Sequence, residues 1–206
     1  MGRRAERVDE TRERITEAAV RLHTTVGPSR ASIAAIAEAA GVTRLTVYRH
    51  FADLDAVYLA CMAHWAARHP RPDPEAWRAI TDLEPRARRA FEELYGWFGE
   101  HTDELDPINR DLAVMPASAR ARREAGSRAQ ADAIAYGPAR AATDRGPRSR
   151  LDLAVARHLV DYATWRSLAL DQGLGEGELV EVAVRMLLSV TPEGRARGDR
   201  GGETST

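Results

Sequence analysis

The chain has 206 residues, of which 44% are hydrophobic, 30% charged and 6% aromatic. This composition excludes collagen-like, disordered and membrane-spanning classes and indicates a globular protein of one or two domains. All 30 basic residues are arginines, and with 31 acidic residues they give a net charge of −1. The charge is unevenly distributed, because residues 1–50 contain nine Arg and six Asp or Glu and leave the rest of the chain acidic.

Three sequence features predict a cytoplasmic protein. Cys61 is the only cysteine, so an intramolecular disulfide is excluded. The N-terminal sequence MGRRAERVDE lacks the apolar core of a signal peptide. No stretch approaches the roughly 18 apolar residues of a membrane span, so we expect no membrane partner.

Apolar residues recur at intervals of three and four along the chain, while strand signals are scarce, so we expect an all-α fold. The first predicted helix starts at Arg12 and ends before Gly27-Pro28. Ser32, Thr43 and Asp53 are short polar residues that each precede an apolar helical pattern. Each is therefore predicted to cap the N-terminus of a helix.

Prolines and glycines divide the rest of the chain. Three prolines within residues 69–74 predict a connection without a regular helix. Asp106-Pro107 predicts the N-cap and first residue of a short helix that ends near Pro116. We expect breaks at residues 137–138 and 144–147 and a disordered tail from residue 191. Three further helices are predicted, at Arg120–Ala135, Leu151–Gln172 and Glu176–Val190.

Residues 33–51, IAAIAEAAGVTRLTVYRHF, have the spacing of a helix-turn-helix. Ala37 is small where two helices would cross, Gly41 can adopt a positive φ in the turn, and Val47 can anchor the second helix. A helical hairpin within an enzyme or a scaffold protein is the alternative interpretation of this pattern.

The outward face of the second motif helix favours DNA. Once Val47 and Phe51 are assigned to the core, the remaining side chains suit guanine, thymine methyl groups and phosphates. Glu38 is the only acidic residue between Gly27 and Phe51. The residues predicted to bind DNA are Arg30, Ser32, Thr43, Arg44, Leu45, Thr46, Tyr48, Arg49 and His50, of which the first three begin helices and can hold phosphate.

The segment from Thr11 to Trp65 resembles the N-terminal domain of TetR-family transcriptional regulators, most specifically in TVYRHF. This resemblance implies a three-helix DNA-binding domain, a fourth connecting helix, and a helical C-terminal domain that binds a small molecule and forms a homodimer. It implies that residues 43–46 and 48–50 lie on the recognition helix, with Tyr48 and His50 at phosphates. Leu54 departs from the family pattern, because many members have a lysine there, so one phosphate contact is expected to be missing.

We therefore expect a DNA-binding domain at residues 1–52, an effector-binding and dimerisation domain at 53–190 and a disordered tail at 191–206. The large aromatic residues beyond residue 50 predict an apolar pocket for an uncharged or weakly acidic, partly aromatic effector, although such rings also form ordinary cores. His158 is predicted to share a helix face with Tyr162 and Trp165. The complete predicted effector set is Trp65, Phe91, Tyr95, Phe98, Met115, His158, Tyr162 and Trp165.

The last helix carries two apolar stripes, one from Leu179 to Val190 and a second through Val180, Val184 and Leu188. One stripe can pack on its own core and the other on a partner. In the family the last two long helices form the dimer interface, and residues 151–172 and 176–190 have the matching places. A twofold dimer predicts a palindromic operator. Effector binding is expected to shift the helix Leu54–Arg68 and so release the DNA. Repression is expected because it is the family's commonest mode.

The sequence assigns no catalytic residue, metal ligand or cofactor. His64 and His69 are five residues apart, and His158 and Asp161 alone do not make a metal site. Cys61 lies on an apolar stripe, which favours a buried thiol over a nucleophile. The alternative function is a helical enzyme or an interaction module without a DNA role.

Overall fold

The computed structural model describes residues 2–138 and 147–191, and in these two ranges it contains helices and no strand. This confirms the predicted all-α fold. Within the described residues, no helix combines the length and the apolar character needed to cross a bilayer. The chain divides into two compact units, made of residues 1–70 with 101–123 and of residues 71–100 with 124–206.

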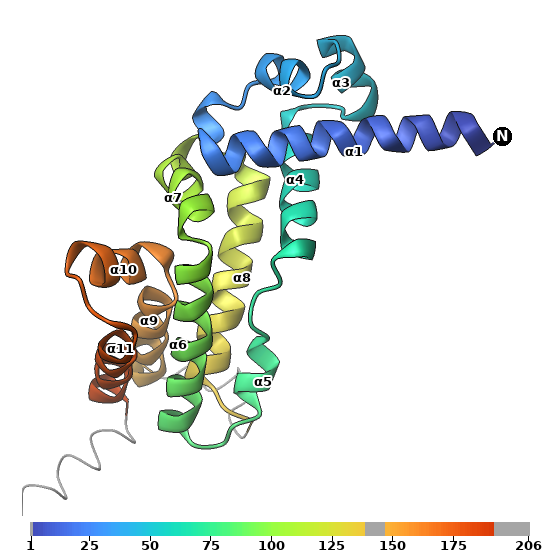
Figure 1. Cartoon of the computed structure of the whole chain (residues 1–206). Helices are drawn as coiled ribbons and strands as arrows, with labels where there is room; N and C mark the ends of the chain where they lie inside the picture. The colour runs from blue at the N-terminus through green and yellow to red at the C-terminus, as the bar shows by residue number, and fades with distance from the viewer. Residues whose placement is uncertain (1, 139–146, 192–206) are drawn as a thin grey trace, which may run out of the picture. The chain divides into compact units, whose positions relative to one another are not determined.

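The first unit contains the N-terminal helices shown at the blue end of Figure 1. Its helices are α1 (Gly2–Thr25), α2 (Ile33–Ala39), α3 (Arg44–His50), α4 (Leu54–Arg68) and α7 (Thr102–Arg110), together with the first residues of α8 (Ala117–Ala135). Short 3-10 turns at Pro28–Arg30 and Leu112–Val114 complete the unit.

Three predicted caps are confirmed. The Ser32 side chain accepts the backbone N–H of Ala35, Thr43 accepts that of Thr46, and Asp53 accepts that of Ala56. Each bond satisfies one of the amides that the first turn of a helix leaves without a partner. These caps fix where α2, α3 and α4 begin.

The core of the first unit lies among α1, α2, α3 and α4. Its buried side chains are Ile15, Ala19, Ile36, Ala37, Val47, Phe51, Val57 and Cys61. A second buried cluster joins Tyr58 of α4 to Met115 and Ala119. At about 25 cal/mol for each Å² of buried apolar area, this packing rather than local propensity stabilises helices as short as α2 and α3.

The second unit is built on α6 (Leu83–Glu100), which packs against α5 (Pro74–Arg78), α10 (Tyr162–Arg166) and α11 (Glu176–Val190), while α9 (Pro147–Leu159) packs against α11. In α6, the side chains of Phe91, Leu94, Tyr95 and Phe98 are all buried. α11 has the bounds that the sequence predicted.

The predicted helix over 151–172 is wrong, because the chain breaks between α9 and α10. Asp161 is an N-cap and accepts the backbone N–H of Ala163 at 2.7 Å, and a π-helical turn, Ser167–Asp171, follows α10. The face that His158 was predicted to share with Tyr162 and Trp165 is therefore interrupted. His158 is exposed, whereas the two aromatic rings are buried.

The prediction that Asp106-Pro107 starts a helix is also wrong. α7 begins at Thr102 and contains Pro107 in its interior. Proline lacks an N–H, so the carbonyl of Asp103 loses its helical partner, but Asp103 is exposed and water can bond it. Further down the chain α8 starts at Ala117, slightly before the predicted Arg120, and α1 starts well before Arg12. The predicted break at 144–147 and the predicted tail fall mainly on residues 139–146 and 192–206, which lie outside the described residues.

Candidate functional site

The outward face of α3 is the first candidate site. Val47 and Phe51 are both buried in the core, as predicted, and Phe51 is the C-cap residue of α3. On the opposite side Leu45 is 63% exposed and Tyr48 is 54% exposed. Arg44 and Arg49 are exposed beside them. A short helix therefore presents a large aliphatic group, an aromatic ring and two cations together.

The hydroxyls of Thr43 and Thr46 bond each other at 2.9 Å, and Thr43 also accepts the backbone N–H of Thr46. Each of the two threonine hydroxyls has one proton, and the bond between the two hydroxyls uses one of these two protons. One proton is therefore left to donate outward from the N-terminal end of α3. A hydroxyl donor beside the first amides of a helix suits an anionic oxygen.

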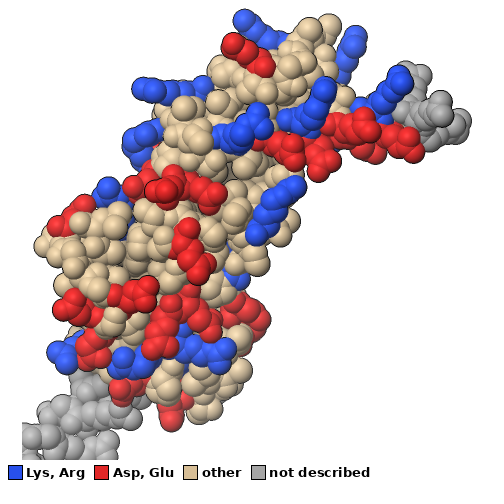
Figure 2. All heavy atoms as spheres, viewed as in Figure 1, with Lys and Arg blue, Asp and Glu red and all other residues tan. Residues whose placement is uncertain are grey.

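The other predicted DNA residues lie around α2 and α3. Arg30 ends a 3-10 turn and Ser32 caps α2, and both are exposed. His50 ends α3 and is half-buried, while Leu54 begins α4 and is 37% exposed. Figure 2 shows arginine side chains around this end of the unit and acidic side chains along the N-terminal helix.

The sequence reasoning missed Arg12. Its guanidinium lies 4.1 Å from the ring centroid of Phe51 and donates to the backbone carbonyl of His50. Arg12 thus joins α1 to the C-terminal end of α3. In the sequence Arg12 is one of several polar residues on the exposed side of the first predicted helix, so the helical pattern alone could not predict this long-range contact.

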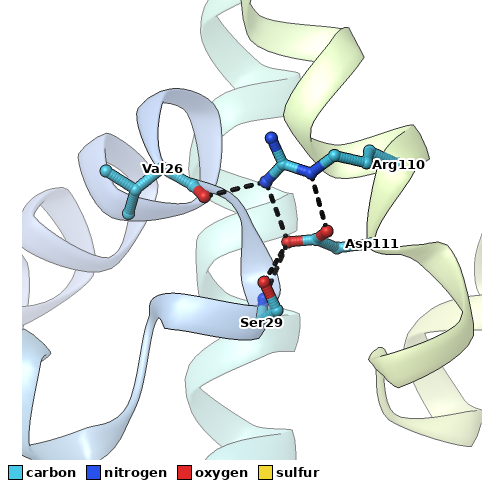
Figure 3. A network of polar contacts seen from close by, with 4 residues as sticks. All are labelled: Val26, Ser29, Arg110 and Asp111. Carbon is cyan, nitrogen blue, oxygen red and sulfur yellow. Dashed lines mark hydrogen bonds and ion pairs between the residues drawn. The ribbon is translucent and has the colours of Figure 1, made fainter.

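A second feature missed from sequence joins the segment between α1 and α2 to the end of α7 (Figure 3). The Arg110 guanidinium donates to the carbonyl of Val26 at 2.9 Å and to the Asp111 carboxylate at 2.9 Å. Asp111 also accepts the backbone N–H of Ser29 at 3.0 Å and the Ser29 hydroxyl at 2.6 Å. Hydrogen bonds from Arg110 and then Ser29 hold the pKa of the Asp111 carboxyl well below its usual range. The carboxylate is therefore the form that holds this junction together.

The predicted effector residues divide between the two units. Phe91, Tyr95, Phe98, Tyr162 and Trp165 lie together in the second unit, where Phe98 contacts the rings of Tyr162 and Trp165 at centroid distances of 5.3 and 5.7 Å. Tyr95 donates its hydroxyl to the carbonyl of Leu159 at 2.9 Å, and burial raises the pKa of that hydroxyl.

The remaining effector predictions lie elsewhere. Met115 belongs to the buried cluster with Tyr58 in the first unit. Trp65 stacks on His69, also in the first unit, and His158 is exposed on α9 in the second. The ring cluster of the second unit is therefore the part of the predicted set that the fold brings together.

Comparison with known proteins agrees with this geometry. Residues 15–61 match the model of the family described as bacterial regulatory proteins, tetR family. No curated protein matches the chain.

Solved structures match over most of the chain. One is a tetR-family transcriptional regulator from Streptomyces coelicolor, with a TM-score of 0.61, 20% identity, and coverage of 94% of this chain and 86% of that chain. A second is the multidrug binding protein EbrR complexed with imidazole, with a TM-score of 0.52, 23% identity and coverage of 85% and 93%. A third is the regulator FadR from Bacillus subtilis in complex with stearoyl-CoA, with a TM-score of 0.53, 14% identity and coverage of 88% and 98%.

At these identities the solved structures establish a shared fold. The match over residues 15–61 covers the core of the first unit, including the three capped helices and the buried Val47 beneath the exposed face of α3. Over this segment, the chain is similar to the bacterial regulatory proteins of the tetR family.

Proposed function

We propose that this protein is a transcriptional repressor that binds a palindromic DNA operator as a homodimer and is released by a small apolar or aromatic effector. The observation that carries the proposal is the composition of the α3 face, where Leu45 and Tyr48 are more than half exposed between two arginines. Burying such groups against a partner is favourable, and a duplex supplies both apolar methyl groups and phosphates.

Each side chain has a role in this proposal. Arg44 and Arg49 can each donate two hydrogen bonds to guanine, and Leu45 can contact a thymine methyl group. Tyr48, His50 and the outward hydroxyl of the Thr43–Thr46 pair can donate to phosphate oxygens. Arg30 and Ser32, at the start of α2, are proposed to contact the backbone of the same duplex.

A homodimer is proposed because α11 has apolar groups on more than its packed face. Leu179, Ala183 and Leu187 are buried, whereas Met186 is 40% exposed and Val182 is half-buried. Two subunits related by a twofold axis would present two copies of α3, so half-sites should lie about 34 Å, or a multiple of it, apart. A DNA operator as partner places the proposed action in the cytoplasm, and the proposal includes no catalytic activity.

The ring cluster of the second unit is the proposed effector region, centred on Phe98, Tyr162 and Trp165. EbrR and FadR share the fold and are described as complexes with imidazole and stearoyl-CoA. Effector binding is proposed to favour a position of α4 that separates the two copies of α3. A coupling of about 3 kcal/mol would lower operator affinity roughly 150-fold.

Selection of bound sequences from random double-stranded DNA tests this function. We expect enrichment of a palindrome, which would establish both operator binding and twofold geometry. On the selected operator, Arg44→Ala should lower the affinity about tenfold or more, because one bidentate base contact is worth about 1–3 kcal/mol.

Arg122→Ala is the matched control, because Arg122 is an exposed arginine of the same unit on α8. It should leave the affinity for the operator unchanged. No enriched sequence, or equal losses in the two variants, would favour an interaction module without a DNA role.

A further inference from the structure

Three side chains with metal-binding donor atoms meet in the first unit, away from α3. They are His69, His101 and Glu104, called here the His69 cluster. One donor atom from each lies within 4.8 Å of the others. His69 ends α4 and His101 precedes α7, so the fold joins two positions 32 residues apart in the sequence.

The local geometry turns these donors toward one another. The Nδ1 atom of His101 lies 3.5 Å from an Oε atom of Glu104, three residues later in the first turn of α7. The rings of His69 and His101 are nearly perpendicular, with centroids 4.8 Å apart. His101 is the N-cap residue of α7, yet its side chain makes no capping bond to the helix.

The surroundings favour a cation that is partly shielded from water. Trp65 stacks on His69 at 4.6 Å and meets the ring of His101 edge-on at 5.6 Å. All three cluster residues are half-buried. Asp103 and Glu104 supply two negative charges at the start of α7, which offset the positive end of the helix dipole.

The arginine next to His69 in the sequence, Arg68, forms contacts with residues outside the cluster. Arg68, directly before His69, bonds His64 and lies 3.9 Å from a carboxylate oxygen of Glu17 on α1. Its charge is therefore held toward α1 by partners of its own.

We propose that His69, His101 and Glu104 bind one divalent transition-metal ion, of which Zn²⁺ is the best match. Two imidazoles and one carboxylate are ligands that zinc accepts, whereas magnesium and calcium prefer oxygen alone. Tetrahedral bonds of about 2.0–2.2 Å put donor atoms roughly 3.4 Å apart, so side-chain rotations that bring the donors up to about 1.4 Å closer would complete the site. Three protein ligands leave a fourth position for water or a small ligand.

Such a metal ion would tie the C-terminal end of α4 to the N-terminal end of α7. This inference does not rest on DNA binding or on the ring cluster of the second unit. It adds a ligand class that the sequence did not predict, although the spacing of His101 and Glu104 was a local signal for it.

Titration of the untagged, chelator-treated and dialysed full-length chain with Zn²⁺ tests the proposal. We expect one ion per chain by calorimetry and a higher thermal unfolding midpoint with Zn²⁺. Co²⁺ should produce the visible absorption bands of a four- or five-coordinate ion, and Mg²⁺ should not compete.

His69→Gln, His101→Gln and Glu104→Gln should each weaken Zn²⁺ binding at least about tenfold, since even the loss of a group that only hydrogen-bonds a metal ligand has an effect of that size. His158→Gln is the matched control, because His158 is an exposed histidine of α9 outside the cluster. It should bind Zn²⁺ as the wild type does.

The three separate substitutions guard against the misfolding of any one variant, and circular dichroism in chelator checks each fold. Absence of one-to-one binding, or unchanged affinity in all three variants, would overturn the proposal. No DNA is present in these measurements, so their outcome is independent of the operator experiment.

Discussion

Gly27 is the residue on which the junction between α1 and α2 depends. Its φ of 92° and ψ of 160° lie in a region that is essentially restricted to glycine. A Cβ atom there would clash with Arg110 Nη2 and Asp111 Oδ2. The backbone conformation and the close approach of the network in Figure 3 therefore both require glycine.

Gly27→Ala should destabilise the protein by about 1–3 kcal/mol from backbone strain alone. Displacement of Arg110 and Asp111 would add to this cost. Urea unfolding monitored by circular dichroism measures the change in the free energy of unfolding.

Gly126→Ala is the control, because Gly126 is inside α8 and nothing lies within 4 Å of its added Cβ. It should raise the free energy of unfolding by up to about 1 kcal/mol, since alanine is the better helix former. Equal stability of Gly27→Ala and the wild type would contradict the role given to Gly27.

At this scale the sequence predicted what depends on near neighbours. Ser32, Thr43 and Asp53 were identifiable as caps because each bonds an amide three residues later. Arg86 was not identifiable, because arginine is usually exposed. It is 4% exposed and donates to carbonyls that include that of Ile134, 48 residues away.

At the scale of elements, α1 and α4 are joined by a buried polar contact. His23 Nδ1 lies 3.1 Å from Cys61 Sγ, and the His23 ring stacks on Tyr58 at 4.3 Å. The Nε2 atom of His23 is buried without a hydrogen-bond partner among the described residues. Burial lowers the pKa of His23 from 6.5 to about 4 and raises the pKa of Cys61 to about 12. Both side chains are therefore neutral at pH 7, and the thiol is not a nucleophile.

Protonation of His23 should weaken the packing of α1 on α4. Because the pKa of His23 is lower in the folded chain, the unfolded chain binds more protons between pH 6.5 and pH 4. The stability present above pH 6.5 is therefore lost as the pH falls through this window, by about 3 kcal/mol at pH 4. The free energy of unfolding as a function of pH measures this loss.

His23→Phe should remove the histidine contribution, so that its free energy of unfolding falls less steeply from pH 6.5 to pH 4. His158→Phe is the control, because His158 is exposed on α9 and should leave the wild-type slope intact. Parallel curves for the wild type and His23→Phe would refute the assignment.

The two errors in predicted elements have a common cause. Aspartate is a favoured N-cap residue, so Asp161 and Asp106 could each begin a helix, and the local sequence does not distinguish the one that does from the one that lies inside a helix. Asp161 is a cap, whereas Asp106 lies inside α7 together with Pro107. Packing of α7 on α1 outweighs one lost backbone bond, and that packing is not visible in the local pattern.

At the scale of the whole molecule, the proposed homodimer places the exposed side of α11 at a partner. Met186→Glu should therefore raise the dimer dissociation constant about tenfold or more, because a buried unpaired carboxylate is costly at an interface. Analytical ultracentrifugation over a range of concentrations measures this constant.

Val114→Glu is the matched control, because Val114 is 62% exposed in the first unit, outside α11. It should leave the dissociation constant unchanged. A dimer of wild-type strength in Met186→Glu would exclude this side of α11 from the interface.

The sequence predicted the helix-turn-helix and its exposed face because the features that define this motif, its caps, its turn glycine and its apolar spacing, each depend on residues close together in the chain. It did not predict the His69 cluster or the network of Arg110, Asp111 and Ser29. Each of these joins segments more than 30 residues apart, and pairing of that kind follows from the tertiary fold.

The shortness of α2 and α3 has a consequence for how the first unit opens. Each has seven residues, well below the roughly 12–15 at which an isolated helix becomes even marginally stable in water. Neither can persist once its shared core with α1 and α4 is lost. Amide hydrogens in the middle of α2, of α3 and of the packed turns of α4 should therefore exchange with solvent through one shared opening reaction, with the same free energy of opening. Helix α3 would then unfold only together with the rest of the first unit.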